Sequence, residues 1–359
     1  MVRLRYIFMI MLVVVTSCRQ IEPLVEQELS QGPEFTAEIE SFDPETKTAL
    51  DGNSVVWSAA DQIAVFQGTA KADKYQVDED CIGTKEGIFA IVAKGETSSA
   101  ENFNANIAIY PYQDGLTVTP TSATEYKITG LTIPSTQTYT ANTFANGSFL
   151  MAAITDGLTD HTLTFRNLCG ALKLQLKGTA KIKSIELKGN DGEPLSGAAA
   201  ITIYNDGSSP TLEMSENASA MVSVNWIDGV QLNPDTATPF FITIPPTSFE
   251  KGFTVKIIDI MGAEATVQTS KSNVVSRSYV HTMPEVTIEP TLPSVNESAM
   301  SGLSIACIGN SITQGVGANG NPYPNQLAAR LNAAVKNLGV SGTSLCQGGA
   351  RTCNIGKLT

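Results

Sequence analysis

The chain has 359 residues, of which 42% are hydrophobic and 16% are charged. That length accommodates two or three domains with buried cores, and the low charged fraction excludes a largely disordered chain or a coiled coil. Acidic residues outnumber basic ones by 35 to 23, which gives a formal net charge of −12. Because such a surface repels phosphate backbones, we expect no nucleic-acid partner.

The N-terminus has the pattern of an export signal. Arg3 and Arg5 supply positive charge, and an apolar run at residues 7–15 follows them. The run is about half as long as the ~20 residues that a membrane-spanning helix needs. We therefore predict a cleaved signal peptide at residues 1–17.

The end of this signal, Val-Thr-Ser-Cys at residues 15–18, resembles the lipobox of bacterial lipoproteins. The resemblance implies that Cys18 becomes a lipidated N-terminus, which holds the protein on a membrane. The alternative is an ordinary secretory signal followed by a chance cysteine. Residues 18–34 are polar and contain proline, which is typical of a tether. Arg19 resembles the sorting signal of outer-membrane lipoproteins, so we expect the outer membrane or cell surface, with the periplasmic face left open.

The stretch at residues 35–288 alternates between apolar and polar side chains, as in LKLQLK at residues 172–177. Gly, Asn, Asp and Pro interrupt this alternation at close intervals. Such a pattern is typical of antiparallel β-sandwiches rather than of βαβ units. The stretch is long enough for two sandwiches, which we place at residues 35–160 and 161–288.

Several motifs in this stretch resemble the fimbrillin-like lipoproteins of Bacteroidetes. FTAEI at residues 35–39, TKTALDG at residues 46–52 and DQIAVF at residues 61–66 are similar to the opening of that family. RNLCGAL at residues 166–172 and the turn GNDG at residues 189–192 are similar to the start of its second domain. The resemblance implies two tandem transthyretin-like β-sandwiches and a role in pili, adhesion or surface display. Fimbrial subunits and cell-surface glycans are the partners that such a role implies.

The pattern changes beyond the sandwiches. Residues 289–301 are rich in proline and serine, which is typical of a linker. We predict a buried parallel strand at residues 303–308, a helix that begins near Pro322, and a second strand at residues 335–340. Strand, helix and strand at this spacing form a βαβ unit, so residues 302–359 predict an incomplete α/β segment.

The motif GNSIT at residues 309–313 resembles the first sequence block of the SGNH (GDSL-type) hydrolases. By this resemblance Ser311 is the nucleophile, with Asn310 where the family often has Asp. Gly342, after the second strand, matches the second block, whose glycine contributes a backbone N–H to the oxyanion hole. The resemblance implies a flavodoxin-like α/β fold and attack of Ser311 Oγ on an ester, with acylated carbohydrate as the expected substrate class. The alternative is a chance Gly-Asn-Ser turn.

The hydrolase pattern is incomplete in this chain. The sequence has no Asp, Glu or His between Ser311 and Thr359, so the family's Gly-x-Asn-Asp and Asp-x-x-His blocks are missing. Without a general base a serine hydroxyl is a poor nucleophile, so we expect this chain to be inactive as given. Three interpretations stay open. The chain is part of a longer surface esterase on a fimbrillin-like stalk, a non-enzymatic fimbrial or adhesive lipoprotein with a vestigial hydrolase tail, or a glycan-binding sandwich.

Neither a cofactor nor a metal site is predicted. The chain has only two histidines, and its six cysteines show no metal-ligand spacing. Cys346 and Cys353 either form a disulfide in an oxidising compartment or stay as thiols. Trp57 and Trp226 are predicted to pack in the sheets rather than to act as sugar platforms.

Overall fold

The computed structural model describes residues 32–41, 55–95, 103–291, 304–319, 321–331 and 333–342. The protein is mainly β, as the sequence predicts. The described residues fall into two compact units, a large β-rich one and a smaller one that includes residues 304–342. Among them, no helix is long and apolar enough to cross a membrane. Cys18, Cys346 and Cys353 lie outside the described ranges.

The strands and helices of the described ranges have the following bounds in chain order. They are β1 Phe35–Ile39, β2 Gln62–Gln67, β3 Asp73–Val77, the short 3-10 helix Glu79–Cys81, β4 Glu86–Ala93, β5 Asn106–Tyr110, β6 Thr117–Pro120, β7 Glu125–Ile133, β8 Thr136–Thr138, β9 Met151–Ile154, β10 Thr162–Asn167, β11 Gly170–Lys177, β12 Lys181–Gly189, β13 Gly197–Tyr204, β14 Thr211–Met214, β15 Met221–Gln231, β16 Thr238–Ile244, β17 Thr247–Phe249, β18 Phe253–Asp259, β19 Glu264–Thr269, β20 Asn273–Val275, β21 Val280–Thr287, β22 Ser304–Gly309, α2 Ser311–Gln314, α3 Tyr323–Leu331 and β23 Ala334–Gly339.

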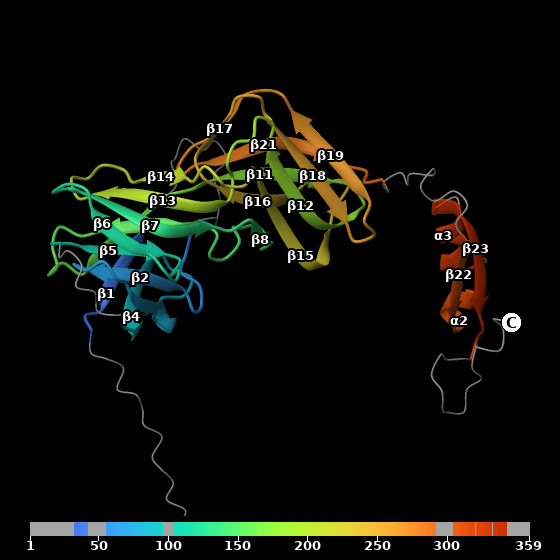
Figure 1. The fold of residues 1–359 in the computed structure, drawn as a ribbon, viewed down its shortest axis with the longest axis horizontal. Coiled ribbons are helices and arrows are strands. Elements are labelled where there is room, and N and C mark those ends of the chain that lie inside the picture. The colour runs from blue at the N-terminus through green and yellow to red at the C-terminus, as the bar shows by residue number, and fades with distance from the viewer. Residues whose placement is uncertain are drawn as a thin grey trace, which may run out of the picture. The chain divides into compact units, whose positions relative to one another are not determined.

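The first sheet closes into a barrel in the order β1-β10-β9-β5-β2-β3-β4 (Figure 1). In β1 every second side chain is buried, whereas all five residues of β5 are buried. Trp57 is only 1% exposed, and its ring packs edge-to-face on Phe89 and Phe165 at centroid distances of 4.8 and 5.6 Å. The predicted packing role of this tryptophan is therefore confirmed.

Alternation predicts antiparallel sandwiches, and the mainly β structure is consistent with them, but alternation does not predict that the first sheet closes on itself. The closing contact is β1, which pairs antiparallel with β4 and parallel with β10, where Ala37 lies opposite Leu163. β1 and β10 are far apart in the chain. Local alternation reports which face of a strand is buried but not its partner or direction, so the sequence could not predict the closure.

Four further sheets complete the β-rich unit. They are the three-stranded β16-β11-β21, the five-stranded β19-β18-β12-β15-β8, the four-stranded β14-β13-β7-β6 and the pair β17-β20. Most neighbours are antiparallel as predicted, but β11 and β21 pair in parallel, as do β15 and β8. Trp226 of β15 is half-buried and stacks on Phe240 of β16 with ring centroids 5.4 Å apart.

Strand pairing crosses the predicted division between residues 160 and 161. β10 follows that point, yet it pairs with β1 and β9 of the barrel. β13, later still, pairs with β7 and also contacts β9. The loop after β9 and the turn after β13 therefore come together on the outside of the barrel.

The smaller unit contains a parallel pair, β22 and β23, in which Gly309 lies opposite Gly339. α2 follows β22 directly, and α3 begins one residue after Pro322 and packs on β23 (Figure 1). The strand, helix and strand are thus the predicted ones. The described residues between Ser304 and Gly342 contain two strands and two helices, so the wider flavodoxin-like sheet that the resemblance implies is not seen among them.

Candidate functional site

Ser311 lies at the junction of β22 and α2. Asn310 caps the helix, because its side chain accepts a hydrogen bond from Ile312 N at 3.1 Å. Short polar residues favour this position, since their side chains satisfy a backbone N–H that has no partner inside the helix. Ser311 is therefore the first helical residue, half-buried, at the carboxyl end of a parallel strand.

Gly342 lies in the turn after β23 and has a positive φ of 78°. The residue before it ties this turn to α2, because Ser341 N donates a hydrogen bond to Gln314 Oε1 at 2.6 Å. β22 and β23 are parallel, so the loops that follow them leave the same edge of the pair. The structure thus brings the turn of Gly342 and the helix of Ser311 together.

The segment around Ser311 lacks the groups that would activate it. From Ser304 to Thr359 the sequence contains no carboxylate side chain and no imidazole. Neither a base for the hydroxyl proton nor a carboxylate to orient such a base is therefore supplied by this segment. Ser311 thus lies at the start of α2 and Gly342 in a turn tied to that helix, and residues 304–359 supply no acid–base group to either.

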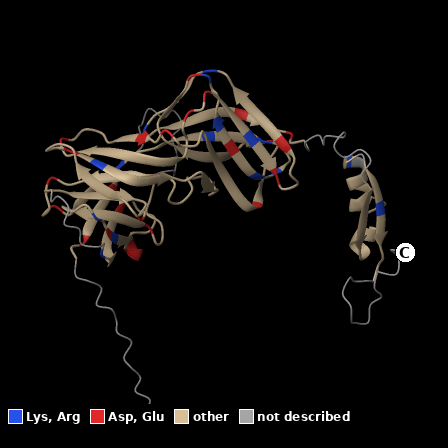
Figure 2. Ribbon diagram, viewed as in Figure 1, with Lys and Arg blue, Asp and Glu red and all other residues tan. Residues whose placement is uncertain are grey.

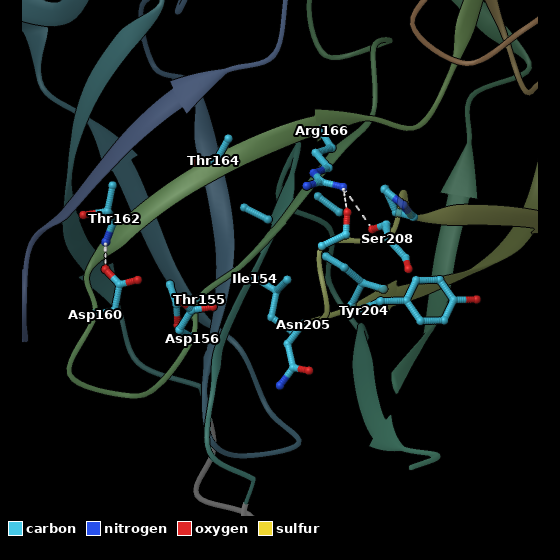
Figure 3. Close-up of a pocket in the computed structure, with 15 residues that line it drawn as sticks. Ile154, Thr155, Asp156, Asp160, Thr162, Thr164, Arg166, Tyr204, Asn205 and Ser208 are labelled. Atoms are coloured by element: carbon cyan, nitrogen blue, oxygen red, sulfur yellow. Dashed lines mark hydrogen bonds between the residues drawn. The ribbon is translucent and has the colours of Figure 1, made fainter. Parts of the chain in front are cut away.

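A better-formed site lies on the β-rich unit, in a hollow that we call the β10 groove (Figure 3). Its volume is about 320 Å³, and it lies between the outer face of β9 and β10 and the β13–β14 hairpin. It is lined by Ala152, Ala153, Ile154, Thr155, Asp156, Asp160, Thr162, Thr164, Arg166, Ile203, Tyr204, Asn205, Gly207, Ser208 and Pro210. This volume is within the range of small-molecule sites in proteins, roughly 300–1,000 Å³.

One wall of the groove is the loop after β9, which a buried side chain holds in place. Asn106, 1% exposed, donates hydrogen bonds from Nδ2 to the carbonyl oxygens of Asp160 at 2.7 Å and Leu158 at 3.2 Å. Asn106 N also donates to Thr155 Oγ1 at 2.9 Å, at the start of the same loop. These bonds fix the backbone that carries Asp156 and Asp160, so the wall is formed before any ligand arrives.

The opposite wall is the β13–β14 turn, which Arg166 fastens to β10. Arg166 Nη1 donates to the carbonyl oxygens of Gly207 at 2.8 Å and Ser208 at 3.0 Å (Figure 3). Arg166 is also the only basic residue among the groove's lining residues. One of its nitrogens is thus engaged in holding the wall in position.

Several polar side chains of the groove have no hydrogen-bond partner within the described ranges. Asp156, Thr162 and Thr164 are exposed, and Asn205 is half-buried. Figure 3 shows Asp156 and Asn205 on either side of Ile154. Within the described ranges, no hydrogen bond engages the carboxylate of Asp156 or the side-chain amide of Asn205. A ligand rich in hydrogen-bonding groups can therefore use both side chains.

The sequence contained only part of the signal for this site. In TLTFRN, the sequence of β10, the polar residues Thr162, Thr164 and Arg166 occupy one face, which alternation alone reveals. The turn that covers this face comes from β13 and β14, and no local pattern connects the two segments. In the described ranges, no group of three or more His, Cys, Asp or Glu residues is arranged to hold a metal ion.

Comparisons with known proteins give distant likenesses. No protein-family model matches the chain, and no curated protein matches it. A candidate cell adhesion protein from Bacteroides ovatus is 13% identical with a TM-score of 0.42, over 71% of this chain and 91% of that one. Another from Bacteroides uniformis is 14% identical with a TM-score of 0.38, over 71% and 93%. The tip fimbrial protein Mfa3 from Porphyromonas gingivalis, with a C-terminal truncation, is 9% identical with a TM-score of 0.28, over 70% and 96%. At these scores the likenesses carry no argument about function.

Proposed function

We propose that the chain is a cell-surface protein that acts by binding, as an adhesin or a fimbrial component. The observation that carries the proposal is the β10 groove, whose two walls are held by Asn106 and Arg166. The side chains of Asp156 and Asn205 in this groove have no hydrogen-bond partner within the described ranges, which is the arrangement expected of a preformed binding site. The segment around Ser311, in contrast, lacks a general base.

Surface attachment is part of the proposal. Cys18 carries the lipid, residues 18–34 form the tether, and the signal peptide at residues 1–17 is removed. Residues 35–288 form the tandem fimbrillin-like stalk, in which β10 is part of the first sheet. Labelled palmitate is expected to enter the wild-type protein in a bacterial host and not the Cys18→Ala variant. Equal labelling of both proteins would contradict the anchor.

Adhesion of whole cells tests the binding function. A non-adherent bacterial host that displays the full chain is expected to be retained on a mucin-coated surface, and the same host with the empty vector is not. Purified full chain, solubilised in detergent, should compete with the displayed protein for the mucin surface and release the cells. Equal retention of the two hosts would contradict a role in adhesion.

A second candidate function rests on the geometry around α2. We propose that Ser311 and Gly342 are the nucleophile and the oxyanion donor of an SGNH-type esterase site that needs a base which residues 304–359 do not supply. The linker at residues 289–301 would join this segment to the stalk. The full chain is expected to hydrolyse 4-nitrophenyl acetate no faster than its Ser311→Ala variant. A clearly faster wild type would show that another part of the chain supplies the base.

A further inference from the structure

We propose that the β10 groove binds a neutral oligosaccharide through neighbouring hydroxyl groups of its sugar rings. This proposal rests on the proposed binding function and adds the chemistry of the partner and the residues that recognise it. It is argued from three features of the groove: its polar groups, its charges and its continuation into a second hollow.

The side chains in the groove suit sugar hydroxyl groups. The carboxylate of Asp156 only accepts hydrogen bonds, and its two oxygens can receive two adjacent hydroxyl groups. The amide of Asn205 both donates and accepts, as do the hydroxyl groups of Thr162 and Thr164. Ile154, between Asp156 and Asn205 in Figure 3, offers apolar contact to a ring carbon. A sugar ring presents the same mixture of hydroxyl groups and C–H surface.

The charges of the groove favour a neutral ligand. Asp156 and Asp160 contribute two carboxylates, and Arg166, the single cation of the lining, already donates to two carbonyl oxygens. A phosphate or a sugar acid would meet repulsion from both carboxylates. Acidic and basic residues are also interspersed over the β-rich unit (Figure 2), so no broader positive surface draws anions toward the groove in that view.

The groove continues past Asp156 and Asn205. A second hollow of about 550 Å³ also includes Asp156 and Asn205 among its lining residues. Phe103 and Tyr126 contribute its aromatic part, with ring centroids 5.2 Å apart. Asp156 and Asn205 therefore stand where two hollows meet, and a ligand of at least two rings can contact them from both sides.

Array binding tests the proposal directly. Full chain solubilised in detergent is applied to immobilised oligosaccharides of glucose, galactose and mannose, and to uronic-acid oligosaccharides of the same linkages. We expect binding to at least one neutral probe, weaker binding to its uronic-acid counterpart, and loss of binding after periodate, which cleaves vicinal diols. Asp156→Ala and Asn205→Ala should each weaken binding roughly tenfold, the effect of one lost hydrogen bond to a buried ligand group. Asp228→Ala and Asn225→Ala, on exposed positions of β15, are the matched controls.

The outcomes separate this proposal from the function beneath it. Any of three results overturns the oligosaccharide proposal: no binding to any neutral probe, tighter binding to the uronic-acid probes, or groove variants that bind as tightly as the wild type. If the displayed chain still confers adhesion in that case, the binding function stands and its surface lies elsewhere. If the displayed chain confers no adhesion, the binding function itself fails.

Discussion

Replacing Asn106 by alanine tests the idea that a buried side chain shapes the groove. The substitution keeps the backbone of β5 but removes two good hydrogen bonds to the loop after β9, at 2.7 and 3.2 Å. An intramolecular hydrogen bond makes a net contribution of about 0.5–1.5 kcal/mol to the free energy of unfolding, and each buried carbonyl oxygen left without a partner adds a penalty of about 1–3 kcal/mol. Water can reach part of this loop, so we expect a loss of about 2–4 kcal/mol in the free energy of unfolding.

Urea denaturation followed by circular dichroism measures this loss, with Asn225→Ala as the control. Asn225 is exposed, so its replacement should change stability by no more than about 0.5 kcal/mol. Ligand binding by Asn106→Ala should weaken at temperatures where the variant remains folded, because the wall that carries Asp156 is no longer held. A variant as stable as the wild type, or one with unchanged affinity, would refute the reasoning about this loop.

Three further predictions concern the β-rich unit. Trp57→Ala removes the ring that packs on Phe89 inside the barrel, so the free energy of unfolding, measured by urea denaturation, should fall by about 3–5 kcal/mol. A loss below about 1 kcal/mol would contradict the core position of Trp57. Arg277→Ala removes two hydrogen bonds to the carboxylate of Glu40, at 2.6 and 3.1 Å, and should lower the free energy of unfolding by about 1–3 kcal/mol. A double-mutant cycle with Glu40→Gln should show coupling between the two substitutions, and strictly additive losses of stability would argue against the pair. Burial lowers the pKa of His281 below 6.5, so protonation favours the unfolded chain and the stability of the wild type should fall as the pH drops below about 6.5. The stability of His281→Gln should fall less steeply with pH, and parallel curves of stability against pH would contradict the shift.

Local patterns in the sequence predict the parts of this structure that depend on neighbouring residues. The alternation in residues 172–177 predicts a strand with one buried face, and β11 buries that face. The parallel pair β22 and β23 is also predictable, because a strand, a helix and a strand follow one another within a short stretch. Pairings between distant segments, such as β1 with β10, leave no such local trace.

The two candidate sites differ in the same way. The residues around Ser311 form a contiguous motif, so the sequence alone could indicate a candidate nucleophile and the lack of a base among residues 304–359. The β10 groove combines β9 and β10 with the turn after β13, and its supporting residue Asn106 lies on β5. A buried asparagine in an apolar strand is a signal that can be noticed in a sequence, but its partners can be identified only in the folded protein.

Hydrogen–deuterium exchange tests the central claim most directly. Amide exchange of the full chain is compared with and without the neutral oligosaccharide that binds most tightly on the array. The account predicts slower exchange in the loop after β9, around Asp156 and Asp160, and in the β13–β14 turn, around Asn205 and Ser208. Unchanged exchange in both segments, with protection elsewhere on the chain, would contradict it.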